Sequence, residues 1–128
     1  MEFLNYTNLA ILSGVEPHRT ILQERLYRRF LHSGSRSLIV EGKPQAEIAV
    51  RYDRNVTIVS HLSDPMLREA LLTAENIYCR SGYSTIMDLY ALGINYAVLI
   101  PTPGQTEQEY LAEYLQRRGF KCIIQDEV

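Results

Sequence analysis

The segment 80–85, with the sequence RSGYST, has the residue types and spacing of a phosphate-binding turn. It follows a short apolar run and precedes a stretch with helical periodicity, so it lies at the start of an expected helix. Backbone N–H groups at a helix N-terminus have no intrahelical partner and attract anions. Gly82 allows close backbone approach, Ser84 and Thr85 add hydroxyl groups, and Arg80 adds positive charge. The segment predicts a phosphate site; the alternative is an ordinary helix start with a solvated Arg80.

A carboxylate lies one helical turn beyond this segment. Asp88 follows Thr85 by three residues, on a neighbouring face of the same expected helix. A carboxylate at that place is positioned to accept hydrogen bonds from the diol of a ribose. The alternative is an exposed helix residue without a ligand, which is the more common fate of an Asp.

A second polar segment, 101–108, lies between an apolar run and an amphipathic stretch. Thr106 is expected to cap the following helix, with Glu109 as its capping-box partner. Glu107 and Gln108 then belong to the first turn and face the same cleft as the first segment. Each is a candidate ligand contact, and the alternative for each is an ordinary residue of a helix start.

Short apolar runs and amphipathic stretches alternate along the chain and define the elements that hold these segments. The alternation implies right-handed crossovers and an α/β, Rossmann-like fold of one domain, residues 1–128, with a mostly parallel sheet and helices on both faces. In such sheets ligands bind at the carboxyl ends of the strands. The expected strands are 9–12, 37–40, 46–50, 56–59, 76–79, 96–100 and 121–124, and the expected helices are 18–31, 64–74, 85–91 and 106–118.

Local signals also predict one helix start and the side chains that pack inward. Asp64 is expected to cap the second helix, with Pro65 at its first position, where a missing N–H costs little. Apolar residues at helical spacing are expected in the core. They include Met66, Met87, Tyr110, Leu111, Tyr114 and Leu115.

The composition narrows the classes of protein and partner. The chain has 128 residues, 13 basic and 15 acidic side chains and a formal net charge of −2. This balance lacks the broad basic field of nucleic-acid-binding proteins. Two isolated cysteines predict reduced thiols in a cytoplasmic protein, and no apolar run has the length of a membrane span. The histidines, His18, His32 and His61, lack metal-ligand spacing, so no metal is expected.

The segment 79–93, followed by the apolar run 97–101 and the pair Glu107-Gln108, resembles the nucleotide-sugar-binding half of GT-B glycosyltransferases. The nearest resemblance is to the C-terminal domain of glycosyltransferase family 28, as in the MurG-like N-acetylglucosaminyltransferases of peptidoglycan synthesis. The resemblance extends with gaps over 9–124 and is strongest over 79–112. It implies half of a GT-B fold, since such enzymes react in a cleft between two Rossmann-like domains.

The resemblance also implies parts for individual residues in binding a UDP-sugar. The turn 80–85 corresponds to the diphosphate site, with Arg80 stabilising the leaving group, and Asp88 corresponds to the ribose contact. Backbone around Leu62 corresponds to the uracil contact, whereas the first loop departs from the family because Val15, Glu16 and Pro17 replace small residues. The implied donor-binding residues are Ser13, Gly14, Arg19, Leu62, Arg80, Ser81, Gly82, Ser84, Thr85, Asp88, Glu107 and Gln108.

The function that the resemblance implies is donor binding in an inverting, metal-independent glycosyltransferase without a cofactor. The general base is expected from an N-terminal acceptor domain or a partner subunit, so the chain alone is expected to be inactive, and any peripheral membrane association arises through that missing half. The sequence contains no Asp-x-Asp pair, the usual metal-diphosphate binder of the other large transferase class. The alternatives are half of a sugar-nucleotide epimerase or hydrolase, or a non-catalytic module that recruits a transferase.

Overall fold

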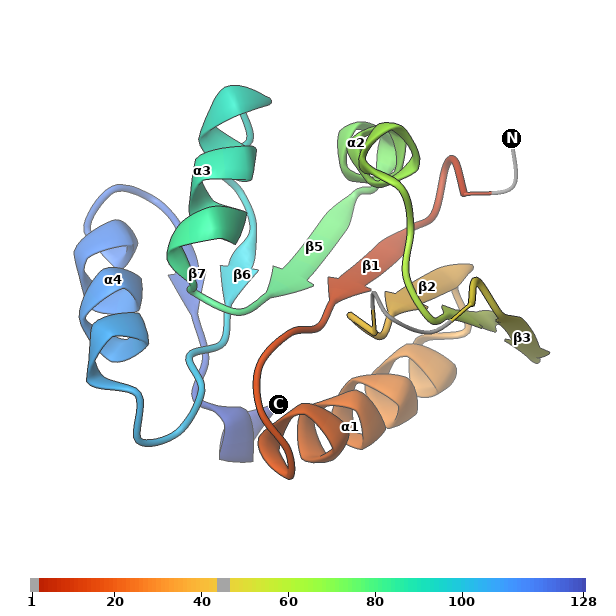
Figure 1. Ribbon diagram of the computed structural model, residues 1–128, viewed down its shortest axis with the longest axis horizontal. Helices are drawn as coiled ribbons and strands as arrows, with labels where there is room; N and C mark the ends of the chain where they lie inside the picture. The colour runs from red at the N-terminus through yellow and green to blue at the C-terminus, as the bar shows by residue number, and fades with distance from the viewer. Residues whose placement is uncertain (1–2, 44–46) are drawn as a thin grey trace.

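One seven-stranded sheet organises the computed structural model, which describes residues 3–43 and 47–128 (Figure 1). The strands are β1 (Asn8–Ile11), β2 (Ser37–Val40), β3 (Val50–Asp53), β4 (Val56–Val59), β5 (Asn76–Cys79), β6 (Val98–Leu99) and β7 (Lys121–Cys122). Their order is β3-β4-β2-β1-β5-β6-β7, and every neighbouring pair is parallel except β3 and β4. The predicted α/β, Rossmann-like class is confirmed.

Helices cover both faces of the sheet and bury a separate apolar cluster on each. They are α1 (His18–Ser33), α2 (Asp64–Thr73), α3 (Tyr83–Ala91) and α4 (Thr106–Gln116), followed by the short 3-10 helix η1 (Gln125–Glu127). Helix α1 packs on one face, whereas α2, α3 and α4 share the cluster on the other (Figure 1). Buried side chains of the helices are Leu22, Leu26 and Phe30 for α1, and Leu71, Leu89 and Leu115 for α2, α3 and α4.

The connectivity creates a switch point beside β1. From β1 the chain passes to β2 and β4 on one side, and β5 then pairs with the opposite side of β1. Ligands of open α/β sheets bind where the connections diverge in this way, outside the carboxyl ends of the strands. The segments there are the β1 loop (12–17), the β5 loop (80–82) and the β6 loop (100–105).

Gly42, just after β2, packs tightly against the β1 loop. Its φ is +73°, and a Cβ built on it would lie 2.1 Å from the carbonyl oxygen of Leu12. No side chain fits at that distance, and the positive φ is itself costly for residues other than glycine. Gly42 therefore fixes how closely the segments after β1 and β2 approach each other.

The strand expected over 46–50 is wrong, and β3 occupies 50–53 instead. Ala46 lies outside the described residues. The turn that joins β3 to β4 contains Arg54, with a φ of +54°, and Asn55. The Asn55 amide donates hydrogen bonds of 2.8 Å to the carbonyl oxygens of Phe30 and Ser35. This anchored turn, rather than the apolar alternation upstream, sets the position of the antiparallel edge strand.

The predicted helix caps are also wrong. Asp64 is the first residue inside α2 and makes no capping bond, so it contributes a negative charge to the first turn instead. Thr106 likewise begins α4 without a capping box. The preceding β6 loop is closed by another bond, because Gln108 Oε1 accepts the backbone N–H of Thr102 at 2.9 Å. Helix α3 begins at Tyr83, two residues before its predicted start.

Three side chains expected in the core lie at the surface. Tyr110 is 66% exposed and stacks on Tyr114, which is also exposed. The inward face of α4 is formed by Ala112 and Leu115, so both tyrosines project away from the sheet. Met87 is 48% exposed for the same reason, since Ile86 and Leu89 form the buried face of α3.

Arg80 ties the loops at the carboxyl edge together from inside the protein. The side chain is 1% exposed. Its Nη1 donates to the carbonyl oxygens of Ile100 at 3.2 Å and Pro101 at 3.3 Å. Its Nη2 donates to the carbonyl oxygen of His18 at 3.2 Å and to Gln125 Oε1 at 2.7 Å. Burial lowers the pKa of Arg80 to about 10, so the guanidinium stays charged at neutral pH.

We expect both Arg80→Met and Arg80→Lys to lower the free energy of unfolding by about 2–4 kcal/mol, because several buried carbonyl groups lose their donors. Lysine keeps the charge, but its compact ammonium cannot reproduce the planar fork of donors. Urea denaturation measures the effect. Arg117→Met is the matched control, since Arg117 forms an exposed pair with Glu113 and its loss should cost less than about 1 kcal/mol. Equal stabilities of Arg80→Met and the original protein would contradict this role.

Candidate functional site

The β1, β5 and β6 loops lie at the switch point, at the carboxyl edge of the sheet. Arg80 of the β5 loop binds the first two carbonyl groups of the β6 loop and the start of α1. Ser81, also buried, donates its hydroxyl to the carbonyl oxygen of Gln108 at 2.7 Å. The loops are therefore held in one arrangement by polar side chains that point inward.

Arg80 does not occupy the place that the sequence suggested. A guanidinium offered to a diphosphate would have to face the cleft, whereas this one is buried and engaged with four oxygen atoms. Its bonds position the loops, and a direct contact with phosphate stays a prediction. Ser81 also bonds to the chain rather than facing a ligand, because its hydroxyl donates to a carbonyl oxygen of the protein.

The N-terminus of α3 keeps the features of an anion site. Gly82 precedes the helix, and a Cβ built on it would meet no atom within 4 Å. The open space above it leaves the backbone accessible to a ligand. Ser84 is exposed and Thr85 is half-buried, so both hydroxyl groups lie near the unpaired N–H groups of the first turn. The attraction for an anion comes from these N–H groups and the helix dipole rather than from a side-chain charge.

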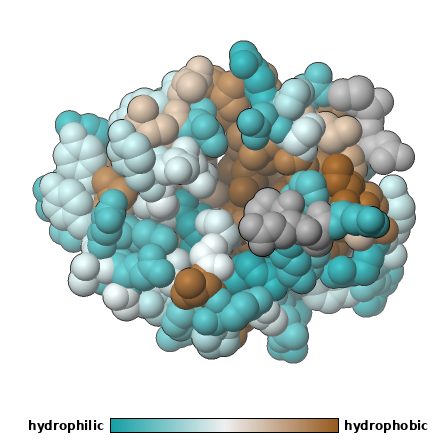
Figure 2. All heavy atoms as spheres, in the orientation of Figure 1, coloured by the Kyte–Doolittle hydropathy of each residue, from teal (hydrophilic) through white to brown (hydrophobic). Residues whose placement is uncertain are grey.

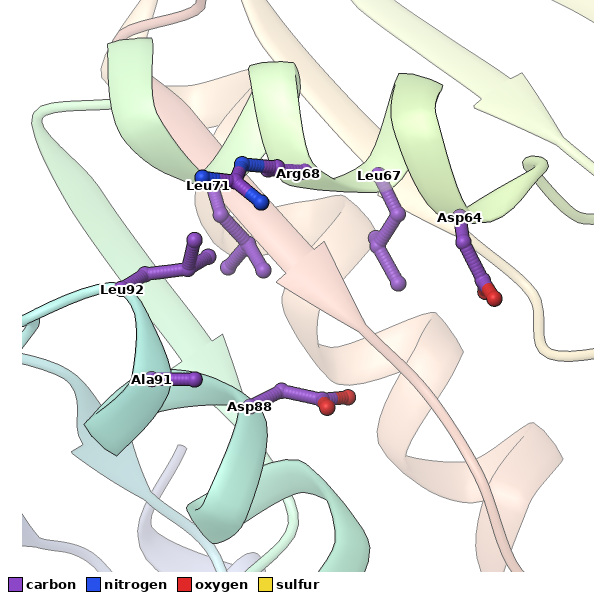
Figure 3. Close-up of a pocket in the computed structure, with 7 residues that line it drawn as sticks. All are labelled: Asp64, Leu67, Arg68, Leu71, Asp88, Ala91 and Leu92. Atoms are coloured by element: carbon purple, nitrogen blue, oxygen red, sulfur yellow. The ribbon is translucent and has the colours of Figure 1, made fainter.

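Asp88 lines a cavity of about 240 Å³ between α2 and α3 (Figure 3). The carboxylates of Asp64 and Asp88 project toward the same end of the cavity. In the space-filling view an apolar hollow bordered by hydrophilic side chains opens in this region (Figure 2). The cavity is smaller than the roughly 300–1,000 Å³ typical of whole-ligand pockets. Its apolar walls are Leu67, Leu71, Ala91 and Leu92.

Glu107 and Gln108 lie at the start of α4, as predicted, but in different states. Glu107 is an exposed residue of the first turn of the helix. Gln108 is half-buried, and its Oε1 is occupied by the Thr102 N–H. Gln108 Nε2 donates at 3.0 Å to the exposed Gln105, a contact that can exchange for a ligand. A ligand contact by either residue remains a prediction.

The β1 loop is closed by its own carboxylate. Glu16 Oε1 accepts the backbone N–H of Thr20 at 3.0 Å and its hydroxyl at 2.8 Å. Arg19 Nη2 contacts Glu16 Oε2 at 2.7 Å. Hydrogen bonds from Thr20 and Arg19 lower the pKa of Glu16 to about 2. The carboxylate thus fills the place at the N-terminus of α1 that a phosphate would take in a glycine-rich loop.

Arg19 is engaged with this carboxylate and with other groups of the chain. The side chain is buried, its Nη1 donates to Gln23 and to the carbonyl oxygen of Glu41, and its remaining donors face Glu16 and Thr20. The expected donor contact of Arg19 does not fit this placement, because an internal anion already satisfies the charge. Ser13 is half-buried and Gly14 is exposed, so these two positions stay next to the site.

Leu62 lies between β4 and α2 and packs, half-buried, against the larger apolar cluster. It precedes the cavity residue Asp64 by two positions, and a backbone contact with a base there stays a prediction. Two polar residues that line the cavity were not predicted from the sequence, namely Asp64, which was expected only as a helix cap, and Arg68. Their spacing of four residues on one helix is the signal that could have paired them.

Among residues 3–43 and 47–128, no group of three or more His, Cys, Asp or Glu side chains is placed to hold a metal ion. Within the same described ranges, no helix has the length and apolar character needed to cross a membrane.

Comparison with known proteins places the site in a family. The glycosyltransferase family 28 C-terminal domain matches residues 32–128. The UDP-N-acetylglucosamine–N-acetylmuramyl-(pentapeptide) pyrophosphoryl-undecaprenol N-acetylglucosamine transferase of Acetivibrio thermocellus is 35% identical over 72 residues, 55% of this chain and 19% of the relative. The transferase of the same name from Desulforudis audaxviator is 46% identical over 55 residues, 41% of this chain and 14% of the relative. No solved structure gives a significant match.

The chain therefore spans less than a fifth of the length of these curated relatives. The family match contains the cavity between α2 and α3, the β5 loop and the β6 loop, and it leaves the β1 loop outside. Since the match covers well over half of the residues, the chain belongs to the family of glycosyltransferase family 28 C-terminal domains.

Proposed function

We propose that this chain binds a UDP-sugar as the donor-binding domain of an inverting glycosyltransferase. The observation that carries the proposal is the position of Asp88. It lines an apolar-walled cavity and belongs to the helix whose N-terminus is the candidate anion site. A nucleoside diphosphate combines a flat base, a diol and an anion. The cavity, the carboxylate and the helix N-terminus offer one complementary feature for each of these parts.

The spacing along α3 supports a single extended ligand. Gly82 and Asp88 are six residues apart, or about 9 Å along the helix axis. The diphosphate would lie over the first turn near Gly82, and the ribose would reach Asp88. The base would then enter the space between α2 and α3, below Leu62. Family membership and the names of the relatives favour UDP-N-acetylglucosamine as the sugar nucleotide.

The proposed leaving-group stabilisation needs no metal ion. As the bond to the sugar breaks, negative charge develops on the diphosphate, next to N–H groups that are already oriented. Arg80 contributes indirectly, because it fixes the β5 loop that carries those groups. The acceptor and the base that deprotonates it would come from a second domain or subunit, where inversion requires attack from the opposite face of the sugar.

We expect the chain to bind UDP and UDP-N-acetylglucosamine equally well in EDTA and in Mg²⁺, because helix N–H groups supply the attraction. Isothermal titration calorimetry measures both affinities, and ADP is the control for base selectivity. Binding that requires Mg²⁺ or Mn²⁺ would show that the metal-free scheme is wrong. Absence of binding under every condition would overturn the proposed function.

Replacement of the cavity carboxylate tests the ribose contact. Asp88→Ala should weaken UDP binding roughly ten- to a hundred-fold, because a charge-assisted contact is worth about 1.5–3 kcal/mol. The exposed position of Asp88 predicts little change in the unfolding midpoint. Glu113→Ala removes another carboxylate at an exposed place on α4 and should leave affinity unchanged. Unaltered UDP affinity in a folded Asp88→Ala protein would refute the contact.

The isolated chain should not transfer sugar, although it binds the donor. Positioning two reactants accounts for a large share of enzymatic rate enhancement, and this chain is proposed to hold one of them. Radiolabelled UDP-N-acetylglucosamine and a lipid-linked acceptor provide the assay. Product formation by the purified chain alone would disprove this division of labour.

A further inference from the structure

Thr102 of the β6 loop carries a buried hydroxyl that the fold does not use. The residue is 1% exposed, and its Oγ1 has no hydrogen-bond partner within residues 3–43 and 47–128. Burial without a partner is unfavourable, because the hydroxyl has lost its bonds to water. Such a group in a native fold calls for a reason outside the stability of the fold.

The backbone of Thr102 is fixed independently of this hydroxyl. Its N–H donates to Gln108 Oε1 at 2.9 Å, and its carbonyl oxygen accepts the N–H of Gln105 at 3.1 Å. A valine would satisfy the same backbone bonds and fill nearly the same space. The β6 loop thus does not require the Thr102 oxygen in order to adopt its conformation.

The hydroxyl faces the β1 loop. A Cβ built on Gly14 would lie 3.7 Å from Thr102 Oγ1, and this is the nearest atom such a Cβ would meet. Gly14 is exposed and has a φ of +100°, so only a hydrogen atom covers the hydroxyl from that direction. Thr102 Oγ1 therefore lies just beneath the surface where the β1 loop, at Gly14, meets the β6 loop, at Thr102. This junction, at the carboxyl edge of the sheet, is called the seam below.

We propose that Thr102 is a donor-binding residue, whose hydroxyl bonds an oxygen of the nucleotide sugar beyond its first phosphate. This inference rests on the proposed function. The oxygen belongs to the second phosphate or to the sugar, which share the ability to accept a hydrogen bond from a hydroxyl. The seam lies beside Gln108, and Ser81 binds the carbonyl of that same residue, so the β5 loop and the start of α4 border it. For the ligand to reach the hydroxyl, the Gly14 backbone would have to move slightly.

Thr102→Val separates binding from stability, because it removes the oxygen and keeps the shape. UDP-N-acetylglucosamine should bind roughly ten-fold more weakly to this variant, whereas affinity for UMP, which lacks the second phosphate and the sugar, should not change. UDP affinity should fall by the same factor if the oxygen belongs to the second phosphate and stay unchanged if it belongs to the sugar. The free variant should melt a few degrees higher, since an unpaired buried hydroxyl is gone. Thr102→Ser restores the oxygen and should restore most of the affinity.

Thr73→Val is the matched control. The Thr73 hydroxyl is used by the fold, since it donates to the carbonyl oxygen of Glu69 at 2.8 Å and accepts the Asn5 N–H at 3.0 Å. This control should melt at a lower temperature and bind all three nucleotides as the original protein does. Calorimetry and thermal unfolding provide the two measurements for every variant.

The outcomes distinguish a failure of the Thr102 contact from a failure of the proposed function. If the original protein binds UDP-N-acetylglucosamine and Thr102→Val binds it equally well, the Thr102 contact is wrong and the proposed function stands. If Thr102→Val weakens UMP as much as UDP and also lowers the melting temperature, the hydroxyl is structural and the contact is again wrong. If the original protein binds none of the three nucleotides, both proposals fail together.

Discussion

The site depends on one buried positive charge, which has no carboxylate partner among the described residues. Arg80 is held by main-chain carbonyl groups and one side-chain amide, which come from α1, the β6 loop and η1. Removing a guanidinium from water is costly, and it is tolerated only where several oriented oxygens replace the lost hydration. The carbonyl groups are thereby fixed in position, and with them the ends of the strands. The candidate anion site at the N-terminus of α3 follows the β5 loop, so its geometry depends on this internal arrangement.

The sequence predicted the interior strands better than the chemistry of the loops. The strands 37–40, 56–59 and 76–79 have the predicted bounds, because a run of apolar residues leaves few alternatives in a sheet covered on both faces. The edge strand was misplaced because its position follows from the anchored Asn55 turn, a contact with residues distant in sequence. Edge strands lack the second neighbour that constrains interior ones.

In the candidate site, too, features set by local sequence were predicted better than those set by distant contacts. Helical spacing and the ends of strands are local properties of the sequence. They correctly predicted the positions of Gly82, Asp88 and the start of α4 in the fold. Arg80 and Arg19 were expected to face a ligand, but both are turned inward and engaged. Residue type gives the charge of an arginine, whereas its direction depends on partners far along the chain. For Arg80 these partners lie between 20 and 62 residues away.

The carboxylate that closes the β1 loop makes that closure resistant to acid. Glu16 ionises with a pKa of about 2 in the fold, against 4.5 for an unperturbed Glu, so its bonds to Thr20 and Arg19 favour the folded state fully above pH 4.5. This contribution is lost only as the pH falls from about 4.5 toward 2. At neutral pH the Glu16 carboxylate is therefore ionised, and its bonds keep the β1 loop closed. A free anion would compete poorly with the Glu16 carboxylate for this place. Glu16 is part of the chain, so its effective concentration there is high.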